Sequence, residues 1–325
     1  MEIHEIIAII PTFFDSQTYS TLIPEPITIQ SHLGELAALM TSICWAITAL
    51  SFEAAGKRVG SLSVNFIRLA LGFVFISLFT LAYRGLLLPT DAPAKAWIWL
   101  SVSGIIGFTL GDLFLFQAFV VVGARISMLM MALAPPITAA IGWLFLHETL
   151  SRQDLLGMAL TVAGIALVTL ERNPGPKLVK LAHPVSGILF AFGGALGQAI
   201  GLIFSKFGMG DYNPFAATQI RIMAGILGFV PLFFVIRGWD RMRSALRNRG
   251  AMARISLGSF FGPFLGVSLS LLAIQNTATG IASTIMAIVP LLIIPPAILL
   301  FGEKVTLKEG IGALIAVGGV ALFFI

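Results

Sequence analysis

The sequence predicts an all-α integral membrane protein with ten transmembrane helices, arranged as two inverted repeats of five helices. Composition is the first observation: 58% of the 325 residues are apolar and only 11% are charged, whereas a soluble domain carries about 25% charged residues. The second is that ten segments are long and apolar enough to cross a bilayer core of about 30 Å. The third is that the second half of the chain repeats prolines, glycines and an arginine of the first.

The ten segments are continuously apolar, which favours helices, because a membrane barrel requires alternating polar and apolar residues. Trp97 and Trp99 open the third segment and Trp239 follows the seventh, where aromatic rings suit the lipid headgroup boundary. The expected spans are residues 33–52, 62–83, 97–119, 126–146, 154–171, 184–206, 214–236, 253–274, 279–301 and 307–325.

Polar segments divide the chain. Residues 1–31 contain no Lys or Arg, so they lack the positively charged region of a signal peptide. We interpret these residues as an N-terminal extension, and disorder is one possible state of this extension. The first repeat is expected at 32–171 and the second at 184–325, with residues 172–183 as a proline-containing linker. A further polar stretch at 237–254 is expected to join the seventh and eighth spans.

Internal repetition is the most informative feature. Identical residues recur 155 positions apart in the later spans of each half, in the pairs Gly107/Gly262, Gly111/Gly266, Met131/Met286, Pro135/Pro290, Glu148/Glu303, Gly157/Gly312 and Gly164/Gly319. In the second and seventh spans the spacing is 153, in the pairs Arg68/Arg221 and Gly72/Gly225. Because five spans are an odd number, the second copy must enter the membrane from the opposite side. Such inverted repeats are typical of secondary transporters, which bind substrate near mid-membrane between the halves.

The repeated segments Gly107–Leu150 and Gly262–Val305 share a further pattern. Each has a proline, then an apolar helix ending in HETL or GEKV, then a glycine-rich last helix. This pattern resembles the EamA-type domain, in the ten-helix branch of the drug/metabolite transporter superfamily, and the resemblance covers about residues 32–325. It implies a transporter of a small molecule. His147 departs from the pattern, which more often has glycine at that position.

Polar side chains at mid-span are the first candidates for substrate binding. Thr41, Trp45 and Thr48 share one face of the first span because they are spaced four and three apart. Gln198 aligns with Trp45 in the sixth span, and Ser205 extends its face. Trp45 is expected to stack on a planar or cationic substrate and Gln198 to donate or accept a hydrogen bond. The alternative is tight packing of glycine-rich helices.

Charged groups inside a span are costly and therefore need a partner or a wet cavity. Asp112 lies well inside the third span and aligns with Val267, so it is a candidate for substrate binding and for proton coupling. The alternative is a structural acid paired with an arginine. Arg68 and Arg221 are repeat mates and are interpreted as a structural pair, with binding of an anionic substrate group as the alternative.

Prolines interrupt the fourth and ninth spans. Pro135, Pro290 and Pro295 each remove a helix hydrogen bond, and kinks at matching places suit gating by one repeat moving against the other. An inert bend is the alternative.

We therefore expect a secondary transporter, an exporter or exchanger, that moves a small organic metabolite such as an amino acid, nucleobase or cationic drug by alternating access. A channel or facilitator is the alternative. An intramembrane enzyme is less favoured, since no Ser/His pair or carboxylate cluster lies at membrane depth. The sequence contains no phosphate-binding loop and no Cys/His cluster with zinc spacing, so no cofactor or metal is expected; the proton is the candidate coupling ion.

Charge distribution gives the expected location. Basic residues stand singly between apolar runs, which indicates a lipid bilayer as partner and no nucleic acid. Most Lys and Arg lie in the loops after the odd-numbered spans. By the positive-inside rule, both termini are expected outside, in a multi-pass protein of the cell membrane.

Overall fold

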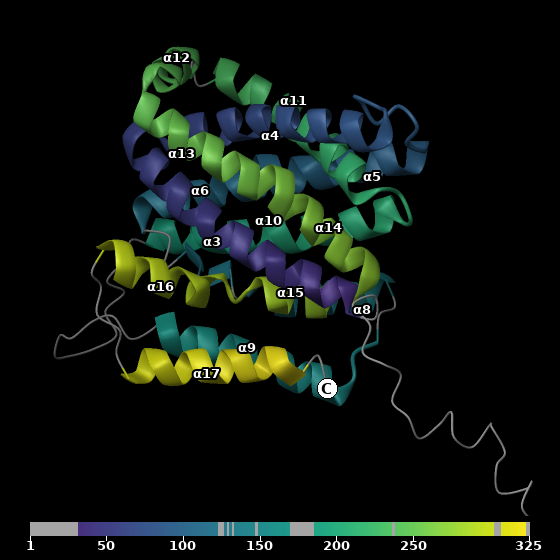
Figure 1. Cartoon of the computed structure of the whole chain (residues 1–325), viewed down its shortest axis with the longest axis vertical. Coiled ribbons are helices and arrows are strands. Elements are labelled where there is room, and N and C mark those ends of the chain that lie inside the picture. Colours follow the sequence, from purple (N-terminus) through teal and green to yellow (C-terminus); the bar gives the residue numbers. More distant parts are fainter. Residues whose placement is uncertain are drawn as a thin grey trace, which may run out of the picture. The chain divides into compact units, whose positions relative to one another are not determined.

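The structure is a computed structural model that describes residues 32–122, 127–128, 130–131, 133–146, 149–169, 185–235, 238–301 and 307–322. Helices and short turns make up these residues, and no strand occurs among them (Figure 1). The helical unit is Gly34–Ile325. The expected extension 1–31, the linker 172–183 and the repeated Glu148 and Glu303 lie outside the described residues.

Helices of the first half are α3 (Leu33–Val59), α4 (Ser61–Arg84), α5 (Ala94–Gly104), the π-helix η2 (Ile105–Gly111), α6 (Asp112–Val121), α8 (Ala134–Leu146) and α9 (Arg152–Thr169). Those of the second half are α10 (Val185–Met209), α11 (Pro214–Val235), α12 (Trp239–Arg247), α13 (Arg249–Ser259), the π-helix η3 (Phe260–Gly266), α14 (Val267–Asn276), α15 (Thr279–Met286), α16 (Val289–Phe301) and α17 (Leu307–Ala321). Within the described residues, seven helical runs are long and apolar enough to cross a membrane. This is a multi-pass membrane protein.

The two halves share their helix boundaries as well as their sequence pattern. The run α5–η2–α6 begins at Ala94, and α13–η3–α14 begins at Arg249, 155 positions later. Every internal boundary of these two runs, including both ends of each π-helix, keeps the same spacing. The repetition found in the sequence therefore extends to an irregular feature, a π-helix in the middle of a span, which hydropathy does not predict.

Glycines let the π-helix η2 pack directly against α10. A Cβ atom on Gly197 would lie 2.6 Å from the Cα atom of Gly111, and one on Gly201 would lie 3.2 Å from the Cα atom of Gly107. Backbones that approach this closely leave no room for a side chain. The glycine run of the sixth span therefore serves packing, which was one of its two interpretations.

Helices α9 and α17 lie side by side (Figure 1) and run in opposite directions. Gln153, in the first turn of α9, donates a 3.0 Å hydrogen bond from Nε2 to the carbonyl of Leu322, just beyond the end of α17. The contacts are also reciprocal. A Cβ atom on Gly164 would lie 2.5 Å from the nitrogen of Ala316, and one on its repeat mate Gly319 would lie 2.5 Å from Oγ1 of Thr161, the mate of Ala316. A local twofold axis between the two helices produces reciprocal contacts of this kind.

The prolines and the loop after the seventh span differ from expectation. Pro135 and Pro290 each occupy the second position of a helix, α8 or α16, where a residue without an N–H group is tolerated. They begin helices instead of bending them, and the ninth span is broken between α15 and α16. Pro295 does lie inside α16. The polar stretch 237–254 contains the short helix α12 and the start of α13.

Candidate functional site

A cavity of about 80 Å³ is lined by residues from both halves of the helical unit. Its wall is mostly apolar, from Ala49, Phe52, Phe108, Leu115, Phe116, Phe119, Met128, Met131, Gly262 and Val267, and its polar members are Trp45, Thr48, Arg68, Asp112, Gln198, Arg221 and Ser270. Helices α3, α4, α6, α10, α11 and α14 all contribute. A smaller cavity of about 30 Å³ shares Trp45, Gln198, Met128 and Met131, so the repeat mates Trp45 and Gln198 line both.

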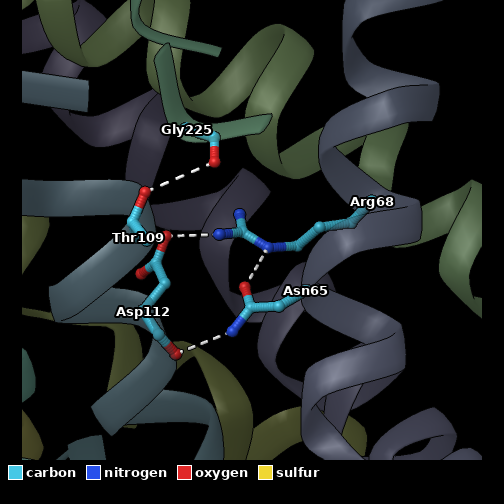
Figure 2. Close-up of polar contacts among 5 residues, drawn as sticks. All are labelled: Asn65, Arg68, Thr109, Asp112 and Gly225. Atoms are coloured by element: carbon cyan, nitrogen blue, oxygen red, sulfur yellow. Dashed lines mark hydrogen bonds and ion pairs between the residues drawn. The ribbon is translucent and has the colours of Figure 1, made fainter. Parts of the chain in front are cut away.

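Two charged residues of the lining of the larger cavity form an ion pair, and Figure 2 shows this pair. Arg68 in α4 donates from Nη2 to the carboxylate of Asp112 at the start of α6. Asn65, one turn before Arg68, completes a ring: it accepts 2.8 Å from Nε of Arg68 and donates 2.9 Å to the backbone carbonyl of Asp112. Arg68 and Asp112 are only 4% and 8% exposed. A buried charge requires such pairing.

Asp112 takes part in this ring twice, through its carboxylate and through its backbone carbonyl. It is the first residue after the π-helix η2, and π-helical turns often occur at functional sites. Aromatic rings hold the arginine from the other sides: Cζ of Arg68 lies 4.7 Å from the ring centroid of Phe116 and 5.7 Å from that of Phe108.

The repeat mate Arg221 lies in the same wall without such a ring. It is 3% exposed, and its Nε has no hydrogen-bond partner among the described residues. Its Cζ lies 4.7 Å from the ring of Phe108. The backbone around it is closely held, because a Cβ atom on Gly104 would lie 2.3 Å from the carbonyl oxygen of Arg221.

The structure brings most of the sequence-predicted residues to one place. Trp45, Thr48, Gln198 and Asp112 line the larger cavity, and so do the two arginines that were interpreted from the sequence as a structural pair. For Asp112, both interpretations hold geometrically, because it is paired with an arginine and also faces the cavity.

Thr41 and Ser205 line neither cavity. Both are fully buried, and their hydroxyl groups bond within the packed helices. Thr41 donates 2.8 Å to the carbonyl of Ala37, while Ser205 donates 2.7 Å to that of Gly201 and lies 2.7 Å from the hydroxyl of Ser103.

Sequence reasoning missed the apolar lining. Phe108, Phe116, Met128 and Met131 line the larger cavity, yet none differs in type from the many Phe and Met residues of the other spans. Asn65 was also missed. Its signal was available, since an amide three residues before a mid-span arginine shares that arginine's helix face.

A second polar cluster lies outside the spans. Asp91, in the turn before α5, accepts 2.9 Å from the hydroxyl of Tyr212 and also bonds to Arg84. Desolvation opposes ionisation of Asp91, but these hydrogen bonds and the arginine charge hold its pKa below the ordinary value.

Comparison with known proteins identifies the repeats. The family model of the EamA-like transporter family matches residues 32–170 and again residues 185–325. A solved crystal structure of another protein is similar with a TM-score of 0.68 and 14% sequence identity, over 89% of this chain and 96% of that one; at this identity the likeness concerns the fold alone. No curated protein sequence matches the chain.

Proposed function

The chain belongs to the EamA-like transporter family, and on this premise we propose that it is a secondary transporter, an exporter or exchanger, of a small organic metabolite. The cavity between the halves carries this proposal, because the residues that line it include the mid-span candidates Trp45, Gln198 and Asp112. A pocket with apolar walls and a few convergent polar groups is the usual form of a small-molecule site.

We propose that residues 32–171 and 184–325 are two five-span repeats of opposite orientation. Three findings support this: the common helix boundaries, the family match to each half, and the antiparallel, reciprocal contact of α9 with α17. In inverted-repeat carriers, alternating access is largely a rocking of one repeat against the other around a fixed site. The break between α15 and α16 and Pro295 inside α16 are the places where we expect the ninth span to bend.

The cavity is small for a metabolite. Its volume of about 80 Å³ is below the roughly 150 Å³ of an engineered cavity that holds benzene. Entry of a metabolite therefore requires the helices around the cavity to move apart. Trp45, Thr48, Gln198 and Asp112 are the proposed contacts, and Thr41 and Ser205 become contacts only if that movement frees their hydroxyl groups.

We propose that Asp112 couples transport to protons. It is the acidic side chain that lines the cavity within the described part of the chain, and its partner Arg68 is held independently by Asn65. Protonation of Asp112 would break the ion pair while leaving Arg68 in place. The cavity would then gain one positive charge, which changes its affinity for a charged or polar solute.

Counterflow in proteoliposomes tests the function. We expect saturable uptake of a radiolabelled solute that accelerates when the same solute is preloaded inside. The variants Trp45→Ala, Gln198→Ala and Asp112→Asn should impair transport without preventing membrane insertion. Trp143→Ala is the matched control for Trp45→Ala, because Trp143 is 67% exposed. Unsaturable conductance would indicate a channel, and unchanged kinetics in all three variants would refute the site.

A further inference from the structure

The two arginines of the cavity are equivalent by repeat but not by environment. Arg68 is neutralised by Asp112 and held by Asn65. The residues at the corresponding positions of the second half, 155 and 153 later, are Val267 and Thr218. Valine accepts no hydrogen bond, and the hydroxyl of Thr218 donates 2.9 Å to the carbonyl of Pro214 within its own helix. Val267 and Thr218 therefore cannot pair with Arg221 as Asp112 and Asn65 pair with Arg68.

Within the described residues, Arg221 is consequently a buried cation without an acidic partner in its own half. It is 3% exposed, its Nε has no hydrogen-bond partner in the described part of the chain, and it faces the cavity. Guanidinium remains charged in proteins, and an unpaired buried charge is strongly unfavourable. Among the described residues, Arg68, Arg221 and Asp112 are the charged members of the lining, and these three side chains together carry one uncompensated positive charge.

We propose that Arg221 binds the carboxylate group of the transported solute, so that the substrate is a small monocarboxylate with an apolar body. This inference rests on the proposed transport function and names its substrate class. A planar guanidinium matches a carboxylate through two parallel hydrogen bonds. The remaining wall, with Phe108, Phe116 and Met131, suits an apolar body.

Charge balance selects among solute classes. A monocarboxylate reduces the excess charge of the cavity from one to zero. A dianionic phosphate ester would replace the excess positive charge by an excess negative one in the same low-dielectric site, and a cationic drug would double the positive excess. Burying uncompensated charge is costly in each of those cases.

Binding to the full-length protein in lipid nanodiscs tests the proposal by isothermal titration calorimetry. The probes are phenylacetate and the smaller butyrate, each compared with its neutral amide and its corresponding amine. We expect each carboxylate to bind at least about tenfold more tightly than its amide, the factor for loss of one charge-assisted hydrogen bond, and the amines to bind more weakly still. Failure of both carboxylates to bind, or equal binding of amide or amine, overturns the proposal.

Variants locate the charge that is responsible. Arg221→Met should weaken carboxylate binding about tenfold or more, whereas Arg221→Lys should retain part of it. Since Arg221 is buried and its replacement risks misfolding, Val267→Asp provides an independent variant. It places an acid at the repeat mate of Asp112 and should neutralise Arg221 from within the protein. Val267→Asn, of equal size but uncharged, should weaken binding less than Val267→Asp; equal effects of the two overturn the proposal.

Transport experiments separate this inference from the function on which it rests. Saturable counterflow of another solute, together with no carboxylate binding, would overturn the monocarboxylate assignment and leave a carrier. Carboxylate binding that depends on Arg221, together with unsaturable conductance, would support the assignment and overturn the carrier mechanism.

Discussion

The ion pair between Arg68 and Asp112 makes a strong prediction about stability. The two side chains are 5% and 12% exposed, and removing one partner of a buried pair typically costs about 3–5 kcal/mol, because the other charge remains buried and unpaired. We therefore expect Asp112→Asn to lower the free energy of unfolding by about 3–5 kcal/mol. Arg68→Met should cost less, because Asp112 also interacts electrostatically with Arg221, although this variant loses the hydrogen bond to Asn65 and the contact with Phe116.

The double variant distinguishes this explanation from simple loss of packing. Once one partner is gone, removing the second eliminates the stranded charge, so the double variant should be no less stable than the worse single variant. Equilibrium unfolding in mixed detergent micelles, followed by tryptophan fluorescence, measures the coupling, which we expect to be at least about 2 kcal/mol. Effects that add to within about 0.5 kcal/mol, as for independent sites, would refute the reasoning.

Glu53 and Lys57 provide the matched control within the same protein. Their 2.5 Å contact joins residues one turn apart on α3, and their side chains are 21% and 59% exposed. Water screens such a pair, so its coupling in the same cycle should be only about 0.3–0.5 kcal/mol. The contrast between the two pairs isolates burial as the cause.

Three further predictions concern packing, capping and pH. Gly197→Ala should lower the unfolding midpoint, because its Cβ would lie 2.6 Å from the Cα of Gly111 and overpacking costs about 1–3 kcal/mol; a raised midpoint, as alanine's helix propensity alone predicts, would contradict this. Asn248→Ala should cost about 0.5–2 kcal/mol in chemical unfolding because Asn248 caps α13, and an unchanged stability would show that the cap is dispensable. The lowered pKa of Asp91 means that its stabilising contribution is present above about pH 3.9 and is lost as pH falls through the folded-state pKa. Asp91→Asn and Tyr212→Phe should both reduce the loss of stability as the pH becomes acidic. If stability falls with pH as steeply in these variants as in the unchanged protein, this prediction is contradicted.

The repeat could be predicted from the sequence because several of the residues that match between the halves constrain the backbone. Gly111 and Gly266 stand 155 positions apart and both end a π-helix. The π-helices themselves could not be predicted, because adding one residue to a turn leaves no trace in a segment that is apolar on every side. The start of α16 at Val289 was missed for a related reason: a proline near a helix start and a proline at a kink look the same in a hydropathy profile.

The candidate site was predicted in part, and the failures have a common cause. Trp45, Thr48 and Gln198 do line the cavity, as their shared helix faces indicated. Thr41 lies one turn from Trp45, but its hydroxyl bonds to the carbonyl four residues earlier, as threonine can in any helix. Helix periodicity places a side chain on a face and does not determine whether its hydroxyl turns toward the cavity or back to the backbone. The pairing of Arg68 with Asp112 is likewise a tertiary contact that spacing alone does not contain.

The distribution of symmetry in this protein is itself an argument about function. The residues that match between halves include glycines that shape the backbone, such as Gly107 and Gly262, and also the two arginines of the cavity. Similar scaffolds are what the proposed rocking of one repeat against the other would need. The lining of the cavity differs between the halves at one position that changes its charge, because the repeat mate of Asp112 is Val267. A fully symmetric lining would leave either two uncompensated arginines or none. Among the described residues, the carboxylate on one side leaves one arginine without an acidic partner of its own, which is what the proposed recognition of a monoanion requires.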